Sequence, residues 1–167
     1  MKQRAYERIG HLYPTVKIPG GGSTEATVIA WIWARTVKCP NPACGCEMPL
    51  ISSYFLSKKS GKEVYVIPKI VGNSVSFTVC NGKPANPAEV DAGTKSRNAK
   101  GRALKAVFCC PKCKNGVVHG EYADSEAENG RMGVNPVCIV AEGSHGRAYL
   151  DFTKEAAEEL LEKVNNY

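Results

Sequence analysis

The chain has 167 residues, of which 43% are hydrophobic, and it carries a formal net charge of +6. This length suits a single domain with its own core, and the basic balance favours polyanionic partners such as nucleic acid. No apolar run approaches the roughly 18 residues of a membrane span, and the N-terminus lacks the apolar stretch of a signal peptide. We therefore expect no membrane association and a cytoplasmic protein whose cysteines are metal ligands or buried thiols.

The N-terminal part is predicted to contain a joint followed by a helix. Residues 1–24 form a mixed segment that ends in the flexible run Gly-Gly-Gly-Ser-Thr. Residues 25–37 are predicted to be helical, which would place Trp31 and Trp33 on nearly opposite faces. A helix that is apolar on more than one side favours contact of Trp31 and Trp33 with a partner. The alternative is a helix in the centre of the protein's own core.

Two closely spaced cysteine pairs have the spacing of zinc knuckles. They are Cys39-Pro-Asn-Pro-Ala-Cys44 and Cys110-Pro-Lys-Cys113. In a knuckle, a tight turn points two thiolates at one metal, and two knuckles complete a tetrahedral site. A four-thiolate site has no open position for water or substrate. The pattern therefore predicts a structural Zn²⁺ and argues against metal catalysis.

The chain contains eight cysteines, so other ligand choices must be weighed. Cys46 and Cys109 compete with the preferred ligands because each lies close to one of them. Cys80 and Cys138 occur in strand-like segments and are predicted to be buried thiols. The alternative to a metal site is a set of unrelated buried or redox cysteines. Zinc ribbons usually separate their pairs by about 15–20 residues, whereas residues 45–109 intervene here, so an inserted structure is expected.

Within this insertion, two alternating apolar runs predict a β-hairpin. Residues 64–71 and 74–80 are separated only by the turn dipeptide Gly-Asn. Pro68 has no backbone N–H, which places its strand toward a sheet edge. A short apolar strand is also expected before the hairpin, within residues 47–56.

Positive charge concentrates in residues 58–62 and 95–105. We expect these segments to contact DNA phosphates through Lys58, Lys59, Lys62, Lys95, Arg97, Lys100, Arg102 and Lys105. Residues 83–105 otherwise read as a loop, and no aromatic residue is interleaved there to stack on bases. The alternative is a solvated loop without a nucleic-acid role.

Further strands are expected after the second knuckle, at residues 116–121, 137–141 and 147–150. A final helix is predicted from Lys154 to Val164. The predicted fold class is α+β, with antiparallel β-hairpins around a four-cysteine zinc-ribbon site, a Trp-rich N-terminal helix and a C-terminal helix. Residues 25–167 would form one zinc-ribbon domain, with residues 116–167 supplying its last strands and helix.

Catalytic residues cannot be assigned from the sequence. The His-Gly-Glu run that begins at His119 matches the His-x-Glu of zinc deaminases, but it follows the Cys-x-x-Cys pair instead of preceding it. A deaminase site would also use only one knuckle and leave the other unexplained.

Several segments together suggest a family. They are residues 8–14, 30–45, 130–133, 140–143 and 146–150. These segments resemble the zinc-ribbon portion of adenine-specific DNA methylases of the DUF1156 type, and the tryptophan-rich stretch that runs into the first knuckle is the most specific part. The resemblance implies a region inserted into a methyltransferase domain, between its S-adenosylmethionine-binding motif and its Asp-Pro-Pro-Tyr type catalytic motif. Neither motif is present in this sequence.

The resemblance carries over only the four cysteines, as zinc ligands. S-adenosylmethionine would then bind only in a parent methylase, and the methyltransferase catalytic domain would be a partner in cis or in trans. The first functional hypothesis is a non-catalytic, DNA-binding zinc module of such a methylase. The second is a zinc-stabilised protein-interaction scaffold with no nucleic-acid role, and the third is an independent metal-dependent enzyme.

Overall fold

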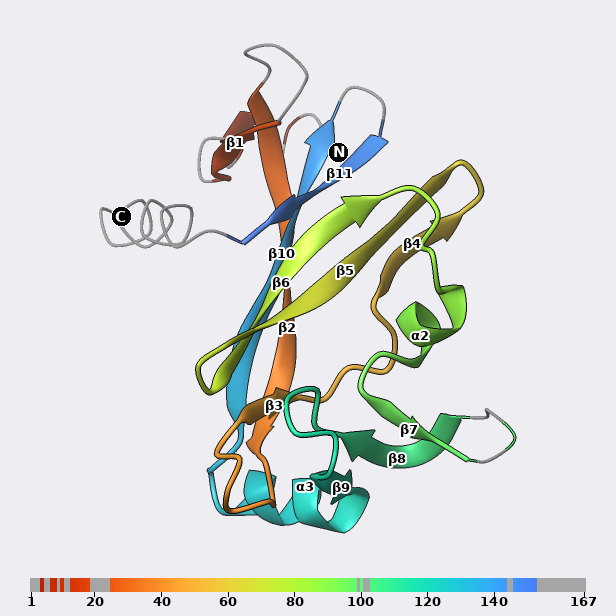
Figure 1. Ribbon diagram of the computed structural model, residues 1–167. Coiled ribbons are helices and arrows are strands. Elements are labelled where there is room, and N and C mark those ends of the chain that lie inside the picture. Colours follow the sequence, from red (N-terminus) through yellow and green to blue (C-terminus); the bar gives the residue numbers. More distant parts are fainter. Residues whose placement is uncertain are drawn as a thin grey trace. The chain divides into compact units, whose positions relative to one another are not determined.

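The computed structural model describes residues 4, 7–8, 10, 13–18, 25–98, 100, 103–143 and 146–152. In these residues the protein consists mostly of antiparallel β-structure with few helices (Figure 1). Residues 1–32 and 138–167 belong to one compact unit, and residues 33–137 form a second. The predicted joint at residues 20–24 and the C-terminal helix lie outside the described residues, so both stay predictions.

The first sheet contains strands from both ends of the chain. Its order is β1 (Thr15–Lys17), β2 (Glu25–Lys38), β10 (Gly133–Gly143) and β11 (Gly146–Asp151). A short strand, β3 (Glu47–Pro49), pairs with the end of β2. β10 and β11 are antiparallel, with Cys138 opposite Asp151, which confirms the strands predicted at residues 137–141 and 147–150. In the first unit, Val28, Ile139 and Ala141 are fully buried.

The predicted helix over residues 25–37 is wrong, because this segment is strand β2. It is rich in β-branched residues and tryptophan, which pack well on a pleated surface, and distant strands supply its hydrogen bonds. Residues two apart lie on the same face of a strand. Trp31 and Trp33 therefore share a face of β2 instead of lying on opposite faces of a helix.

The second unit contains a three-stranded antiparallel sheet, with the order β4 (Phe55–Lys59), β5 (Lys62–Val71) and β6 (Ser74–Asn81). The predicted hairpin is confirmed, since Val71 lies opposite Ser74 across a two-residue turn. Gly72 adopts a φ of 60° at the first position of the turn, as a type II′ turn requires. The strand expected within residues 47–56 is instead divided between β3 and β4.

A second small sheet and two helices complete this unit. The sheet contains β7 (Lys95–Arg97), β8 (Ala103–Cys109) and β9 (Val117–His119), and the helices are α2 (Pro87–Ala92) and α3 (Gly120–Glu128). The sequence did not suggest either helix. Asn86 caps α2 by accepting a hydrogen bond from the Glu89 amide, so part of the loop expected at residues 83–105 is instead helix α2 and strand β7. α3 has no apolar stripe, and its one buried residue is Glu126.

Thr94 connects the beginning of the insertion to β8, the strand before the second knuckle. This residue is 4% exposed. Its hydroxyl accepts a hydrogen bond from the Ile51 amide at 2.9 Å and donates to the carbonyl oxygen of Pro49, also at 2.9 Å. Its backbone carbonyl accepts from the Cys109 amide at 2.8 Å. One side chain and its peptide group thus join the segment after β3 to β8.

We expect Thr94→Val to destabilise the protein by about 1–3 kcal/mol, because the Ile51 amide loses its acceptor in a partly buried position. Urea denaturation of the metal-loaded chain would measure the change. Thr78→Val on β6 is the matched control, since the Thr78 hydroxyl has no hydrogen-bond partner among the described residues. Equal midpoints for the two variants would contradict the connecting role of Thr94.

Candidate metal centre

Four cysteine side chains converge on one point of the second unit. The Sγ atoms of Cys39, Cys44, Cys110 and Cys113 all lie within 4.8 Å of one another. The distance is 3.8 Å from Cys39 Sγ to Cys113 Sγ and 3.8 Å from Cys44 Sγ to Cys110 Sγ. A tetrahedron with Zn–S bonds of about 2.3 Å has S···S edges of about 3.8 Å. The four thiols are therefore spaced to hold one tetrahedral metal ion.

The first knuckle begins where β2 ends. The Cys39 amide donates to the carbonyl oxygen of Cys46 at 2.8 Å, and the Cys44 amide donates to that of Asn41 at 3.0 Å. Gly45 then adopts a φ of 61°, a left-handed conformation that favours glycine. These turns direct two thiols from one short segment to the same side.

The second knuckle has a similar construction and stabilises one of its thiols as a thiolate. The Cys110 amide donates to the carbonyl oxygen of Gly116 at 2.8 Å, and the Gly116 amide donates to Cys113 Sγ at 3.2 Å. Desolvation acts to raise the pKa of Cys113. Hydrogen bonds from the Asn115 and Gly116 amides, and from the thiols of the first knuckle, outweigh it and lower that pKa to about 6.

Gly116 is required because the two knuckles approach each other closely at this position. A Cβ atom on residue 116 would lie 2.2 Å from Cys39 Sγ and 3.5 Å from Cys113 Sγ. Any larger residue would therefore displace a ligand of the first knuckle. The sequence shows Gly116 near the second knuckle, but only the structure shows what it contacts.

Lys112 attaches the inserted hairpin to the second knuckle. Its Nζ donates to the Gly72 carbonyl oxygen at 3.0 Å and to Asn73 Oδ1 at 2.8 Å. The Asn73 carbonyl oxygen in turn accepts from the Glu47 amide at 2.7 Å. The turn between β5 and β6 therefore lies beside the cysteine cluster, although it is distant from both knuckles in sequence.

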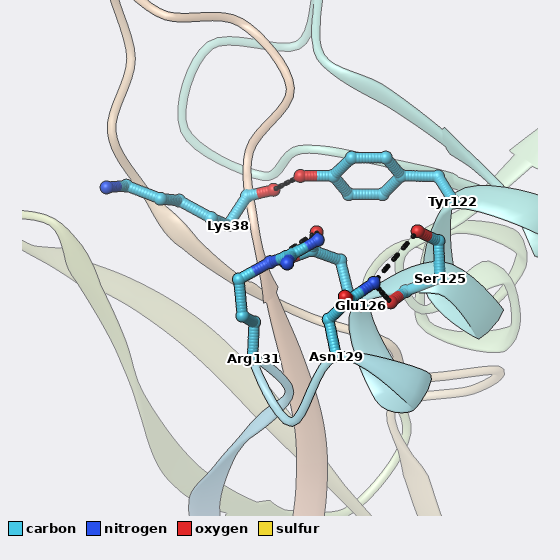
Figure 2. A network of polar contacts seen from close by, with 6 residues as sticks. All are labelled: Lys38, Tyr122, Ser125, Glu126, Asn129 and Arg131. Atoms are coloured by element: carbon cyan, nitrogen blue, oxygen red, sulfur yellow. Dashed lines mark hydrogen bonds and ion pairs between the residues drawn. The ribbon is translucent and has the colours of Figure 1, made fainter.

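Helix α3 is anchored beside the first knuckle by polar contacts (Figure 2). The Tyr122 hydroxyl donates to the Lys38 carbonyl oxygen, one residue before Cys39, at 3.1 Å. At the other end of the helix, Arg131 donates to Glu126 Oε1 through Nε at 3.1 Å and through Nη2 at 2.7 Å. The buried Glu126 carboxylate is thereby paired, as a buried charge must be.

The remaining cysteines lie outside the cluster. Cys46 is fully buried, and burial raises its pKa to about 12. The Cys109 thiol donates to the Lys114 carbonyl oxygen at 3.0 Å. Cys138 is a buried thiol, as predicted, with a pKa raised to about 12 mainly by burial, whereas Cys80 is only partly buried.

The structure distributes the expected DNA-contacting residues over two regions. Lys58 and Lys59 are on β4, Lys62 begins β5, Lys95 and Arg97 are on β7, and Lys100 follows β7. Arg102 and the Lys105 side chain lie outside the part of the chain that the structure describes.

Helix α2 brings these two basic regions together. Lys58 forms an ion pair with Asp91, and Arg97 Nη2 donates to the Ala88 carbonyl oxygen at 2.6 Å. The pKa of Asp91 is lowered mainly by its hydrogen bond with Lys58, with a contribution from the charge of Arg97. Lys58 and Arg97, which are far apart in sequence, therefore hold the same short helix.

The expected partner-contacting tryptophans lie at alternate positions of β2. Trp33 is 51% exposed and Trp31 is partly buried. The Trp31 Nε1 atom is buried and has no hydrogen-bond partner among the described residues.

No protein-family model matches the chain, and no curated protein or solved structure matches it either. The site must therefore be interpreted from its own geometry and chemistry, as a possible four-cysteine metal site in a mostly antiparallel β-protein. Among the described residues, no helix has the length and apolar character needed to cross a membrane.

We expect Gly116→Ala to weaken metal binding by about 10–100-fold, the usual range when the surroundings of metal ligands are altered, because the new methyl group would displace Cys39 Sγ. Competition with a chromophoric chelator would measure the affinity. Gly120→Ala is the matched control, since its Cβ would lie 3.4 Å from the Ala106 side chain, outside the cluster. Unchanged affinity in Gly116→Ala would show that the knuckles are less tightly apposed than described.

Proposed function

We propose that Cys39, Cys44, Cys110 and Cys113 bind a structural Zn²⁺ ion. The observation that carries this proposal is the spacing of the four Sγ atoms, with two cross-knuckle distances of 3.8 Å. Four thiolates suit zinc and leave no open coordination position, so the ion would stabilise the fold and would not activate a substrate. The ion would join the end of β2 to the segment that follows β8.

Metal analysis of the purified chain tests this proposal. We expect one zinc per chain, and Cys113→Ser should lose the metal together with its cooperative thermal transition, because structural zinc contributes folding free energy directly. Cys80→Ser is the control, since Cys80 is a free thiol outside the cluster and should keep a full complement of zinc. A metal-free protein that nevertheless unfolds cooperatively would refute the structural-zinc proposal.

The wider role that we propose is that of a zinc-ribbon module of an adenine-specific DNA methylase. The support is the sequence resemblance, which includes the tryptophan-rich segment now known to be strand β2 and the first knuckle. The chain itself would be non-catalytic. S-adenosylmethionine and the catalytic residues would belong to a methyltransferase domain, in cis or in trans.

Within that role, the basic residues on β4, at the start of β5 and on and after β7 would contact DNA phosphates. Lys59, Lys62 and Lys100 are exposed, and Lys58 and Arg97 flank the same helix. Phosphate contacts position a protein on DNA but carry no sequence information directly. The proposed contribution of this module is therefore affinity and orientation, not recognition of a base sequence.

Salt titration of DNA binding tests this second proposal. We expect the triple variant Lys59→Glu, Lys62→Glu and Lys100→Glu to bind a labelled duplex more weakly. Its slope of log K against log salt concentration should fall by about 2–3, since each phosphate contact contributes about 0.9. A triple variant with the same charge change at Lys17, Lys69 and Lys83, which are also exposed, is the control. Equal slopes for both variants would exclude Lys59, Lys62 and Lys100 as the DNA contacts.

An interaction scaffold without a nucleic-acid role is the second candidate. The observation that favours it is the exposure of Trp33, at 51%, on the same face of β2 as Trp31. Absence of salt-dependent DNA binding in the zinc-loaded chain would place this candidate first.

A further inference from the structure

Strand β5 is paired on only one side along its second half. β6 pairs with β5 from Val64 to Val71, whereas β4 pairs with it only from Lys62 to Tyr65. The Val66 amide still donates, at 2.9 Å, to the carbonyl oxygen of Tyr54, just before β4. Beyond that bond, no residue that the structure describes pairs with the β4 side of β5. The central strand of this sheet thus becomes an edge strand in its second half.

The register identifies the backbone groups at this open edge. The peptide groups of successive residues in an antiparallel strand point alternately to the two neighbouring strands. Because the Val66 amide points to the β4 side, Pro68 and Ile70 point there too. The edge therefore offers the carbonyl oxygens of all three residues and the Ile70 N–H. Pro68 occupies a position where its missing N–H costs no hydrogen bond to β6.

A cleft runs along this edge and provides room for a ligand. Its volume is about 590 Å³, and its lining includes Val66, Pro68 and Ile70 from the edge, Val90 from α2 and Pro111 from the second knuckle. Binding clefts usually have volumes of about 300–1,000 Å³ and predominantly apolar linings. The cleft lies entirely within the second unit.

The side chains beside the edge define what could bind there. Ile67 is 43% exposed, Ile70 41% and Val71 60%, which is unusual for large apolar residues on an open strand. Lys95 and Lys114 line the cleft and are opposed there by one acidic residue, Glu89. The cleft therefore suits a ligand with apolar side chains and a negative charge.

We propose that the open edge of β5 binds an extended peptide segment of a partner protein by β-strand addition. The peptide's amides would donate to the carbonyl oxygens of Val66, Pro68 and Ile70, its carbonyl would accept from the Ile70 N–H, and a carboxylate would face Lys95 and Lys114. Three carbonyl oxygens disfavour a phosphate group, so a nucleic acid backbone fits this edge less well. The proposal does not rest on the proposed DNA contacts, and it assigns Lys95, which the sequence suggested for DNA, to the peptide instead.

Fluorescence anisotropy with the zinc-loaded full chain tests the proposal, using the labelled peptide acetyl-Glu-Val-Thr-Ile-Thr-Val-Glu-amide as the probe. We expect saturable binding. Ile70→Pro should weaken it about tenfold, because the only N–H of the open edge is removed and proline obstructs an added strand. Ile70→Val, which keeps the N–H, should bind within about twofold of the original chain. The same peptide with lysine in place of both glutamates should bind more weakly.

Amide hydrogen exchange distinguishes strand addition at β5 from nonspecific peptide binding. It does not depend on Ile70→Pro, a variant that could lose binding through misfolding. In the unmodified chain, peptide binding should slow exchange of the Ile70 amide but not of the Val71 amide, which already faces β6. Absence of peptide binding, or binding that leaves Ile70 exchange unchanged, would overturn the proposal. A concentration-dependent dimer that Ile70→Pro abolishes would assign the edge to a second copy of the chain, which would also overturn it.

Discussion

The second unit depends on the convergence of four thiols from two segments that are far apart in sequence. Cys44 and Cys110 are separated by 66 positions, yet their Sγ atoms are 3.8 Å apart. Bringing such distant segments together carries a loop-closure entropy cost, which the proposed metal ion would offset. Two neighbouring residues stabilise the same region of the structure. Gly116 permits the close approach of the two knuckles, and Lys112 attaches the β5–β6 turn to the second knuckle.

The sequence predicted the parts of the structure that local signals determine. The cysteine pairs with their prolines indicated the two knuckles, and the Gly-Asn dipeptide between alternating apolar runs indicated the β5–β6 hairpin. Pro68 suggested a strand toward the sheet edge, whereas β5 is the middle strand of its sheet and lacks a partner on the β4 side only in its second half. Only the register shows that β4 ends too early to cover the second half of β5.

The sequence failed where distant contacts decide the outcome. The segment from Glu25 to Lys38 is apolar enough for either secondary structure, and pairing with β1 and β10 makes it a strand. Helix α3 lacks the apolar periodicity that reveals a helix, and contacts such as that of Tyr122 with Lys38 hold it instead. The sequence also could not predict that the two basic regions lie close together, because their proximity depends on the contacts of Lys58 and Arg97 with α2.

The two ends of the inserted segment lie close together, because the thiols of Cys44 and Cys110, which flank it, are 3.8 Å apart. A segment whose ends lie close together can change in length, away from its contacts with the knuckles, at little cost, because loop-closure entropy grows only slowly with length. The turn at residues 60–61, between β4 and β5, is exposed and is a natural place for such a change. Lys112 holds the β5–β6 turn beside the cysteine cluster, whereas the turn at residues 60–61 could take an insertion without displacing the four thiols.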